Sequence, residues 1–327
     1  MSVELSFKNV IICERFAVEA LAALKKNQLF QVKSYQPEHL ATAHVLIIRS
    51  KFKIDRALLD SAPQLEVIIT CTSGFDHIDL EETKKRSVVV MYTPEANMVS
   101  TAEHTWALLL ACSRQVVAAN RQMKSGEWLR DPFVGMELAG KTLGIVGFGR
   151  IGQRVCRIAQ AFDMNVISFD PYQQPEVFDR HGVLRLSYDE LLRQSDIITY
   201  HVPATDETHQ MLNRSHFDSL NGEQIIINAS RGNVIREEDL VEALQQKKIK
   251  TVGLDVFQKE PLPRDSQLLK FQNIVLTPHL GALTNEAFLK ASLQAVQQLE
   301  DYYLKNQIQN TLPLINDWGS LSFQRKE

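Results

Sequence analysis

The amino-acid sequence predicts an α/β protein with two doubly wound parallel-sheet domains, one inserted into the other. Short apolar runs alternate with amphipathic stretches along the chain, which is typical of parallel sheets flanked by helices. The chain has 327 residues, which is too long for one ordinary core and favours two domains. A glycine-rich turn at Gly147 follows a first set of strands, so we expect the second sheet to begin just before it.

The first third of the chain predicts a small doubly wound domain. Apolar runs indicate four strands, over residues 9–13, 44–49, 66–71 and 88–92. Three helical stretches separate them, over residues 15–27, 55–61 and 79–86. Asp55 and Asp79 are suitable N-caps for the second and third of these helices.

A second set of elements follows. A long helix is expected over residues 100–125, where Ser100 and Glu103 fit a capping box. Six further strands are expected, over residues 142–146, 165–169, 197–200, 224–228, 251–254 and 273–276. A last amphipathic helix is expected over residues 285–304.

The glycine turn carries the first chemical signal. Gly147, Gly149 and Gly152 form G-x-G-x-x-G, in which the first permits a tight turn, the second lets a pyrophosphate approach, and the third packs the helix closely. The helix N-terminus favours phosphates. Asp170, which ends the next apolar run, is suited to accept from ribose hydroxyls and to repel a 2′-phosphate. NAD is therefore favoured over NADP, although Arg150 fits either cofactor and such turns also occur for packing alone.

These observations predict a dinucleotide-binding Rossmann domain of residues 99–284, inserted into a flavodoxin-like substrate-binding domain. The substrate-binding domain comprises residues 1–98 and 285–327, because the final helix is expected to return to the first sheet. A cleft between the domains would hold the substrate.

Composition excludes several function classes. Hydrophobic residues make up 44% and charged residues 23%, and the net charge of −3 gives no case for a nucleic-acid partner. The longest apolar stretch, residues 106–112, is far too short to span a membrane, and the N-terminus lacks the pattern of a secretory signal. No metal site is predicted. Reduced thiols in a cytoplasmic protein are expected of the four widely spaced cysteines, Cys13, Cys71, Cys112 and Cys156.

The catalytic candidates lie at the ends of successive strands, where open α/β sheets bind ligands. Arg231 can hold a carboxylate and polarise a neighbouring carbonyl. His279 can exchange a proton with a hydroxyl or carbonyl oxygen, and Glu260 can orient that histidine and raise its pKa. Each residue alone also fits an ordinary role, as a surface ion pair, a structural histidine or a loop acid. Their order after a dinucleotide unit favours oxidation of a 2-hydroxy acid.

Over nearly its whole length the sequence resembles the D-isomer-specific 2-hydroxyacid dehydrogenases. Besides the glycine turn, the motifs that carry the resemblance are N-A-S-R-G at 228–232, G-L-D-V-F at 253–257, E-P at 260–261 and P-H-L-G at 278–281. The resemblance implies that Arg231, Glu260 and His279 are catalytic. It also implies contacts with the cofactor. Arg150 and Ile151 would contact the phosphates, and Asp170 the ribose. His201, Val202, Pro203 and Thr208 would border the adenosine side, and the nicotinamide would be bordered by Ala229, Arg231, Asp255, His279 and Gly281.

Within this family, residues 97–152 are most similar to the 3-phosphoglycerate dehydrogenases, which implies a phosphorylated substrate. The segment at Arg49, Ser50 and Lys51 resembles their phosphate-binding segment, although these residues also fit ordinary surface positions. Thr70 stands where those enzymes more often have arginine. The remaining expected substrate contacts are the backbone of Ser73 and Gly74, together with Asn97 and Arg231.

Alternative functions remain open. One is reduction of hydroxypyruvate, glyoxylate or another 2-oxo acid, and a less favoured one is a non-catalytic, NAD-sensing corepressor-like scaffold. Glu260 argues against a formate-type enzyme, which would call for glutamine there. The resemblance also implies a homodimer, and the aromatic residues Trp128 and Phe133 within an otherwise polar stretch make residues 122–138 the expected interface.

Overall fold

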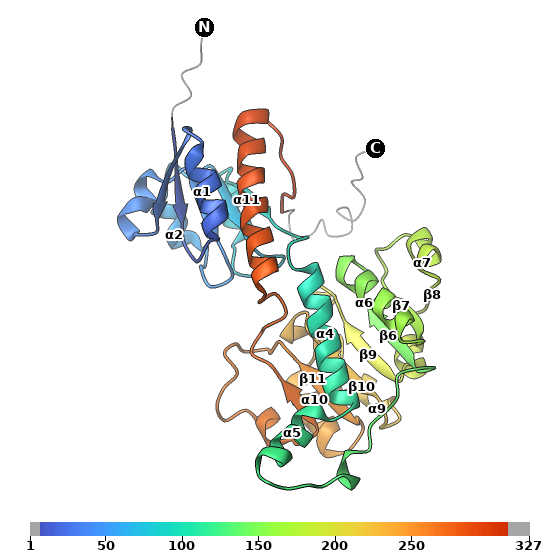
Figure 1. The fold of residues 1–327 in the computed structure, drawn as a ribbon. Helices are drawn as coiled ribbons and strands as arrows, with labels where there is room; N and C mark the ends of the chain where they lie inside the picture. Colours follow the sequence, from blue (N-terminus) through green and yellow to red (C-terminus); the bar gives the residue numbers. More distant parts are fainter. Residues whose placement is uncertain (1–6, 313–327) are drawn as a thin grey trace. The chain divides into compact units, whose positions relative to one another are not determined.

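The computed structural model describes residues 7–312 (Figure 1). The expectations that concern residues 1–6 and 313–327, including the missing secretory signal, lie outside the described part. The chain divides into two compact units: unit 1 comprises Met1–Asn97 and Ala282–Glu327, and unit 2 comprises Met98–Gly281. The chain therefore enters unit 2 at Met98 and leaves it after Gly281.

Unit 1 holds a five-stranded parallel sheet. Its strand order is β2-β1-β3-β4-β5, which is the flavodoxin-like order. The strands are β1 (Lys8–Ile12), β2 (Phe30–Ser34), β3 (Val45–Ile48), β4 (Val67–Thr70) and β5 (Val89–Tyr92). The helices are α1 (Val18–Lys26), α2 (Arg56–Asp60), α3 (Leu80–Lys85) and α11 (Asn285–Lys305), with a 3₁₀ turn, η1, at Pro37–Thr42.

Apolar packing on both faces holds unit 1 together. The helices α1 and α11 lie side by side on one face (Figure 1), where Leu24 and Leu299 are fully buried in one cluster with Val10. Short helices lie on the other face. Asp55 Oδ1 accepts from Leu58 N at 2.9 Å and Asp79 Oδ1 accepts from Glu82 N at 3.0 Å, which confirms both predicted N-caps.

Unit 2 holds a seven-stranded parallel sheet in the order β12-β11-β10-β9-β6-β7-β8. Successive strands are added on one side of β6 up to β8 and on its other side from β9 onwards, as in a Rossmann fold. Ligands bind at the switch point between β6 and β9. The strands are β6 (Thr142–Val146), β7 (Asn165–Phe169), β8 (Leu184–Arg185), β9 (Ile197–Tyr200), β10 (Ile225–Asn228), β11 (Thr251–Leu254) and β12 (Ile274–Leu276).

Helices cover both faces of this sheet (Figure 1). The helix α4 packs against α6 and against β10 and β11, which buries Leu109 completely. The helices are α4 (Met98–Ser113), α5 (Val116–Lys124), α6 (Arg150–Ala161), α7 (Pro175–His181), α8 (Tyr188–Gln194), α9 (Arg214–Asp218) and α10 (Glu237–Gln245). Short 3₁₀ turns are η2 (Asp131–Phe133), η3 (Gly232–Val234) and η4 (Gln267–Lys270).

The structure corrects three sequence-based expectations. The strands β2 and β8 were not predicted, because both lie at a sheet edge and much of their surface is exposed, so neither forms a continuous apolar run. The helix predicted over 100–125 is two helices, α4 and α5, separated at Gln115, whose φ of 52° is left-handed. Ser100 does not cap α4, because the helix already begins at Met98.

Among the helices of residues 7–312, none is both long and apolar enough to cross a membrane. The same residues contain no group of three or more His, Cys, Asp or Glu side chains arranged to hold a metal ion.

Candidate functional site

The three glycines of the turn differ in why a side chain would or would not fit there. Gly147 has φ +92°, and a Cβ there would lie 2.6 Å from the His201 carbonyl oxygen. A Cβ at Gly152 would lie 2.2 Å from the Gly147 carbonyl oxygen, so α6 approaches the turn too closely for any side chain. Gly149, in contrast, has an ordinary φ of −74°, and a Cβ there would meet no atom of residues 7–312 within 4 Å. Nothing in this described part of the chain requires glycine at position 149, which fits a group that approaches from outside.

Asp170 follows β7 and faces the glycine turn. Its Oδ2 accepts from Phe148 N at 2.7 Å, and its Oδ1 accepts from Tyr172 N at 2.9 Å. The carboxylate is thus fixed beside the N-terminus of α6. Oδ1 also accepts from Gln173 N at 3.2 Å, so of the two acceptor sites on each oxygen one, on Oδ2, remains for a ribose hydroxyl. At the helix start, Arg150 is exposed and Ile151 is partly buried.

The segment after β9 contains the expected adenosine-side residues. His201 Nε2 lies 3.0 Å from Thr199 Oγ1, while its Nδ1 is buried without a partner within the described chain. Burial lowers the pKa of His201 to about 3, so its ring is neutral. Thr208 Oγ1 donates to the Pro203 carbonyl at 2.6 Å and therefore closes this loop on itself, and Val202 is partly buried beside Gly147.

Arg231 lies in a tightly built loop after β10. The Asn228 side chain accepts from Ser230 N at 3.0 Å and donates to the Arg231 carbonyl at 2.9 Å. A Cβ at Gly232 would lie 1.9 Å from the backbone of Phe257, so the loop after β10 packs directly on the loop after β11. The sequence therefore holds Arg231 beside the segment that carries Glu260. Ala229, in the same loop, is buried.

Glu260 and His279 are in hydrogen-bond contact. His279 Nδ1 lies 2.7 Å from Glu260 Oε2, and Phe257 N donates to Glu260 Oε1 at 3.1 Å. The hydrogen bond to Glu260 raises the pKa of His279, against burial and the positive charge of Arg231. Partial burial opposes ionisation of Glu260, but the hydrogen bond from His279 prevails and lowers the pKa of Glu260. Arg231 thus acts electrostatically on both partners.

Asp255, at the end of β11, is fully buried. Its carboxylate accepts from Thr277 Oγ1 at 2.6 Å and from His104 Nε2 at 3.1 Å. It also accepts from the backbone N–H groups of Leu280 and Gly281, at 2.7 and 2.8 Å. Burial opposes ionisation of Asp255, but these hydrogen bonds outweigh it and lower the pKa of the carboxyl.

Unit 1 brings together several of the expected substrate contacts. Two of them, Arg49 and Asn97, line one cavity of about 20 Å³ together with Thr72, which is room for about one water molecule. The Arg49 guanidinium lies 5.1 Å from the Phe288 ring centre, and its Nη1 is buried without a hydrogen bond in the described residues. Arg49 is therefore not a free surface charge. Its neighbours Ser50 and Lys51 are exposed.

The loop after β4 is stabilised by hydroxyl contacts. Ser73 Oγ donates to Asn97 Oδ1, and Gly74 is partly buried in the same loop. Thr70 is fully buried and its Oγ1 lies 2.6 Å from Thr72 Oγ1 and 3.1 Å from His77 Nε2. Thr70 thus stabilises this loop from inside the unit.

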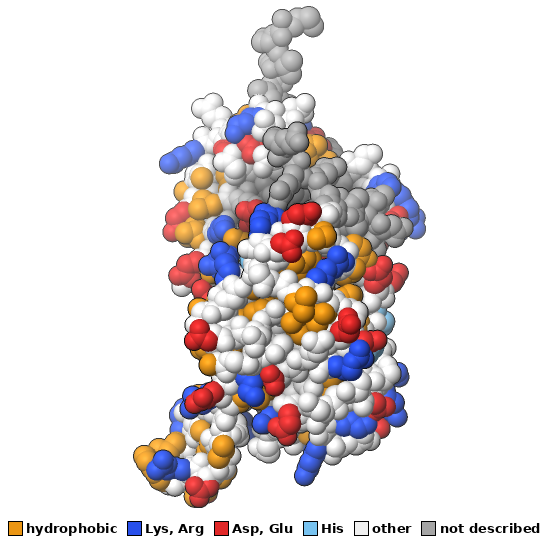
Figure 2. Space-filling model, turned by 90° about the vertical axis from the view of Figure 1, so that its right-hand side faces the viewer, with side chains coloured by type: hydrophobic (Ala, Val, Ile, Leu, Met, Phe, Trp, Pro, Cys, Tyr) orange, Lys and Arg blue, Asp and Glu red, His pale blue; other side chains and the backbone are white. Residues whose placement is uncertain are grey.

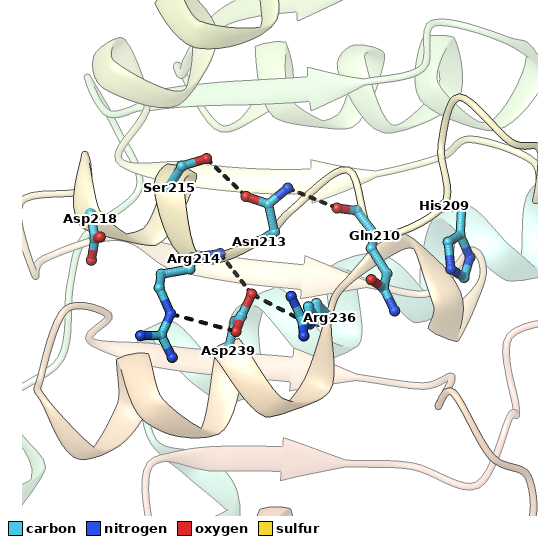
Figure 3. Close-up of a pocket in the computed structure, with 8 residues that line it drawn as sticks. All are labelled: His209, Gln210, Asn213, Arg214, Ser215, Asp218, Arg236 and Asp239. Carbon is cyan, nitrogen blue, oxygen red and sulfur yellow. Dashed lines mark hydrogen bonds and ion pairs between the residues drawn. The ribbon is translucent and has the colours of Figure 1, made fainter.

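A surface hollow of about 570 Å³ lies elsewhere in unit 2, between α9 and α10 (Figure 3). Arg214 Nε and Arg236 Nε each lie 3.8 Å from the Asp239 carboxylate. Arg214 also pairs with Glu242 and Arg236 with Glu238, so acidic side chains compensate both arginines. The hollow contains none of the catalytic candidates, and we assign it no part in the chemistry. Its lining residues are His209, Gln210, Asn213, Arg214, Ser215, Asp218, Arg236 and Asp239.

Sequence reasoning missed two features of these sites. One is the contact of His104 and Thr277 with Asp255, because His104 and Asp255 lie 151 residues apart in sequence. The other is the Tyr172 hydroxyl, which donates to the Glu207 carboxylate and so links the loops after β7 and β9. The tyrosine two residues after Asp170 was the only sequence signal for the second contact.

The sheet order and the glycine turn are those of a dinucleotide-binding protein, and the Arg–Glu–His group lies after the last strands of its sheet. Residues 106–281 match the sequence profile of "D-isomer specific 2-hydroxyacid dehydrogenase, NAD binding domain". The chain belongs to this family, and unit 2 contains its NAD-binding domain.

Individual relatives agree with this assignment. The D-3-phosphoglycerate dehydrogenase of Archaeoglobus fulgidus is 37% identical over 290 residues, which cover 87% of this chain and 55% of that protein. The glyoxylate reductase of Thermococcus litoralis is 40% identical over 242 residues, covering 72% and 73% of the two chains. A D-lactate dehydrogenase from Aquifex aeolicus, solved with NAD and lactic acid, superposes with a TM-score of 0.82 at 28% identity, covering 93% and 99%. The chain spans about half the length of the first curated relatives it matches.

Proposed function

We propose that this protein is an NAD-dependent oxidoreductase that interconverts a D-2-hydroxy acid and its 2-oxo acid. The observation that carries the proposal is the 2.7 Å contact between His279 Nδ1 and Glu260 Oε2, under the influence of Arg231. Its position after the last strands of a dinucleotide-binding sheet supports it further, because ligands bind at that edge.

In this proposal His279 and Arg231 act directly on the substrate, and Glu260 acts through His279. Nicotinamide, when bound, supplies or accepts the hydride. His279 uses Nδ1 to contact Glu260, which leaves Nε2 to give a proton to the carbonyl oxygen or to take it from the hydroxyl. Glu260 stabilises the protonated ring. Arg231 holds the substrate carboxylate and polarises the carbonyl through charge-assisted hydrogen bonds.

The glycine turn fits a dinucleotide. The open space at Gly149 admits a pyrophosphate to the backbone, and Arg150 and Ile151 begin the helix that faces it. Asp170 is fixed for the adenosine ribose, and its charge favours NAD over NADP. Val202, Pro203 and Thr208 would border the adenosine with His201, while Ala229, Asp255 and Gly281 would border the nicotinamide. Because Asp255 is fully buried, we propose that it acts there by shaping the loop.

We propose 3-phosphoglycerate and 3-phosphohydroxypyruvate as the substrate pair, in serine biosynthesis. The similarity to D-3-phosphoglycerate dehydrogenases supports this pair, as does the Nη1 of Arg49, which is buried without a hydrogen bond among residues 7–312. Ser50 would add a hydroxyl near the phosphate, while Asn97 and the backbone of Ser73 and Gly74 would receive the carboxylate.

Reduction of an unphosphorylated 2-oxo acid such as glyoxylate or hydroxypyruvate is the second candidate. One observation favours it: Thr70 is buried and hydrogen-bonded, so this position contributes no cation to a phosphate. The match to a glyoxylate reductase along 73% of that protein points the same way.

A substrate panel tests both candidates. NADH oxidation is measured with 3-phosphohydroxypyruvate, hydroxypyruvate, glyoxylate, pyruvate and phenylpyruvate, in the wild type and in Arg49→Ala. Preference for the phosphorylated compound that Arg49→Ala abolishes supports phosphoglycerate. Preference for an unphosphorylated acid supports the second candidate. No turnover with any compound contradicts both and favours the scaffold.

We also propose a homodimer that uses residues 122–138. Trp128, Leu129 and Val134 are 76%, 54% and 79% exposed, which is unusual for large apolar side chains in one short segment. Phe133 is partly buried. Figure 2 shows apolar side chains gathered on a projecting lobe at the lower left, at the height of α5 and the segment after it in Figure 1.

Light scattering tests this interface. We expect a dimer for the wild type and a monomer for the double variant Trp128→Ser, Val134→Ser, because apolar contact drives such association. A wild-type monomer contradicts the proposal.

We place the protein in the cytoplasm, in keeping with the free thiols at Cys13, Cys71, Cys112 and Cys156.

A further inference from the structure

Two segments of unit 2 lie where the chain crosses between the units. The helix α4 begins at Met98, the first residue of unit 2, and the segment after β12 ends at Gly281, its last residue. The two segments touch. A Cβ at Gly281 would lie 3.6 Å from the Thr101 methyl group and 3.2 Å from Asp255 Oδ2.

A polar cluster joins these segments beneath the catalytic histidine. His104, on α4, places its Nε2 3.1 Å from Asp255 Oδ1 and 3.0 Å from Thr277 Oγ1. Thr277 Oγ1 itself lies 2.6 Å from Asp255 Oδ1. An ionised carboxylate only accepts, so both Thr277 and His104 donate to it, which assigns the His104 proton to Nε2.

The same carboxylate holds the backbone around His279. Leu280 N and Gly281 N donate to its two oxygens, and His279 N donates to the Asp255 carbonyl at 2.9 Å. His279 has φ +55°, a conformation that persists in a non-glycine residue only where the surroundings enforce it. The hydrogen bonds of Asp255 supply that enforcement.

We propose that His104 is a positioning residue for His279. Together His104, Asp255 and Thr277 form a clamp that fixes the left-handed turn and thereby the direction of the catalytic ring. His104 needs no contact with substrate or cofactor for this role, because it acts through the Asp255 carboxylate. This inference rests on the proposed function of His279 as the proton donor.

The test compares two replacements of His104. His104→Gln keeps an N–H donor near the position of Nε2, whereas His104→Leu keeps the size and removes the donor. Glu103→Gln, an exposed neighbour on α4, is the matched control. We expect His104→Leu to lower kcat by about 10- to 100-fold, as misplacement of a catalytic group does, with KM and NADH binding nearly unchanged. His104→Gln should restore most of kcat.

Amide hydrogen exchange provides a readout that is independent of activity. In His104→Leu, the amides of Leu280 and Gly281 should exchange about 10-fold faster, because they lose a fixed acceptor. They should be restored in His104→Gln. If His104→Leu does not fold, Thr277→Val and Thr277→Ser provide the same comparison from the other donor.

The outcomes separate this proposal from the proposed function. An inactive wild type defeats the proposed function, while exchange still decides whether the clamp exists. Normal kcat and normal exchange in His104→Leu overturn the clamp even if the wild type is active. The clamp is also overturned if His104→Gln is as impaired as His104→Leu. A loss of NADH binding in His104→Leu as large as its loss of kcat overturns it too.

Discussion

Replacing Glu260 by glutamine removes the charge that faces His279 and keeps the shape of the side chain. The carboxylate raises the pKa of His279 through the 2.7 Å contact, against burial and Arg231. In Glu260→Gln the pKa of His279 therefore falls. Reduction of a 2-oxo acid needs the protonated ring, so its kcat/KM should decline at lower pH than in the wild type. Oxidation needs the neutral ring, so its acid limb should also move to lower pH.

The size of the shift follows from exposure. The side chains of His279 and Glu260 are 47% and 37% exposed, so water screens the pair. Two unit charges about 4 Å apart interact by about 1 kcal/mol in water and about 4 kcal/mol at a typical protein surface. With the value for water, the loss of about 1 kcal/mol should move both pH profiles down by about 0.7 of a pH unit.

The assay is the pH profile of kcat/KM in both directions, for the wild type, for Glu260→Gln and for Glu238→Gln. Glu238 is 72% exposed in the same unit and serves as the matched change of charge. Both limbs should move down in Glu260→Gln alone. Superimposable profiles for all three proteins would refute the reasoning, because Glu260 would then not control the protonation of His279.

Four further variants test other parts of the site. Arg231→Ala should raise KM and lower kcat together, by about two decades or more in kcat/KM, as steady-state kinetics will measure; unchanged kinetics would remove this arginine from the site. Gly149→Ala should leave the melting temperature unchanged but weaken NADH binding about 10-fold in a fluorescence titration, because its Cβ meets only the approaching phosphates. Gly152→Ala should instead lower stability by about 1–3 kcal/mol in denaturant unfolding, since its Cβ would overlap the Gly147 carbonyl; the reverse pattern would contradict the assignment. Asp170→Ala should raise the NADP-to-NAD ratio of kcat/KM about 5- to 10-fold by removing about 1 kcal/mol of repulsion, and an unchanged ratio would assign cofactor choice elsewhere.

Local signals in the sequence predicted the local structure well. Asp55 and Asp79 cap their helices because capping depends on a few neighbouring residues. The buried strands were visible as apolar runs, whereas the half-exposed edge strand Phe30–Ser34 was not. The break at Gln115 also escaped prediction, because the polar residues there fit a helix surface as well as a turn.

The residues of the candidate site could be predicted from the sequence, but the contacts between them could not. Motif order predicted Arg231, Glu260 and His279 as candidates. A geometric reason for their proximity comes only from the structure, in the packing of Gly232 on Phe257. The burial of Asp255 and its bond to His104 depend on the meeting of β11 with α4, two elements far apart in sequence. No local pattern encodes that contact.

The most direct test of the central claim is NADH oxidation by a 2-oxo acid in the wild type and in His279→Ala, with NADH affinity measured in parallel. We predict turnover by the wild type, and in the variant a loss of about 100-fold or more with NADH affinity nearly intact, as for removal of a general acid. Turnover in His279→Ala within a few-fold of the wild type would contradict the assignment of the proton donor.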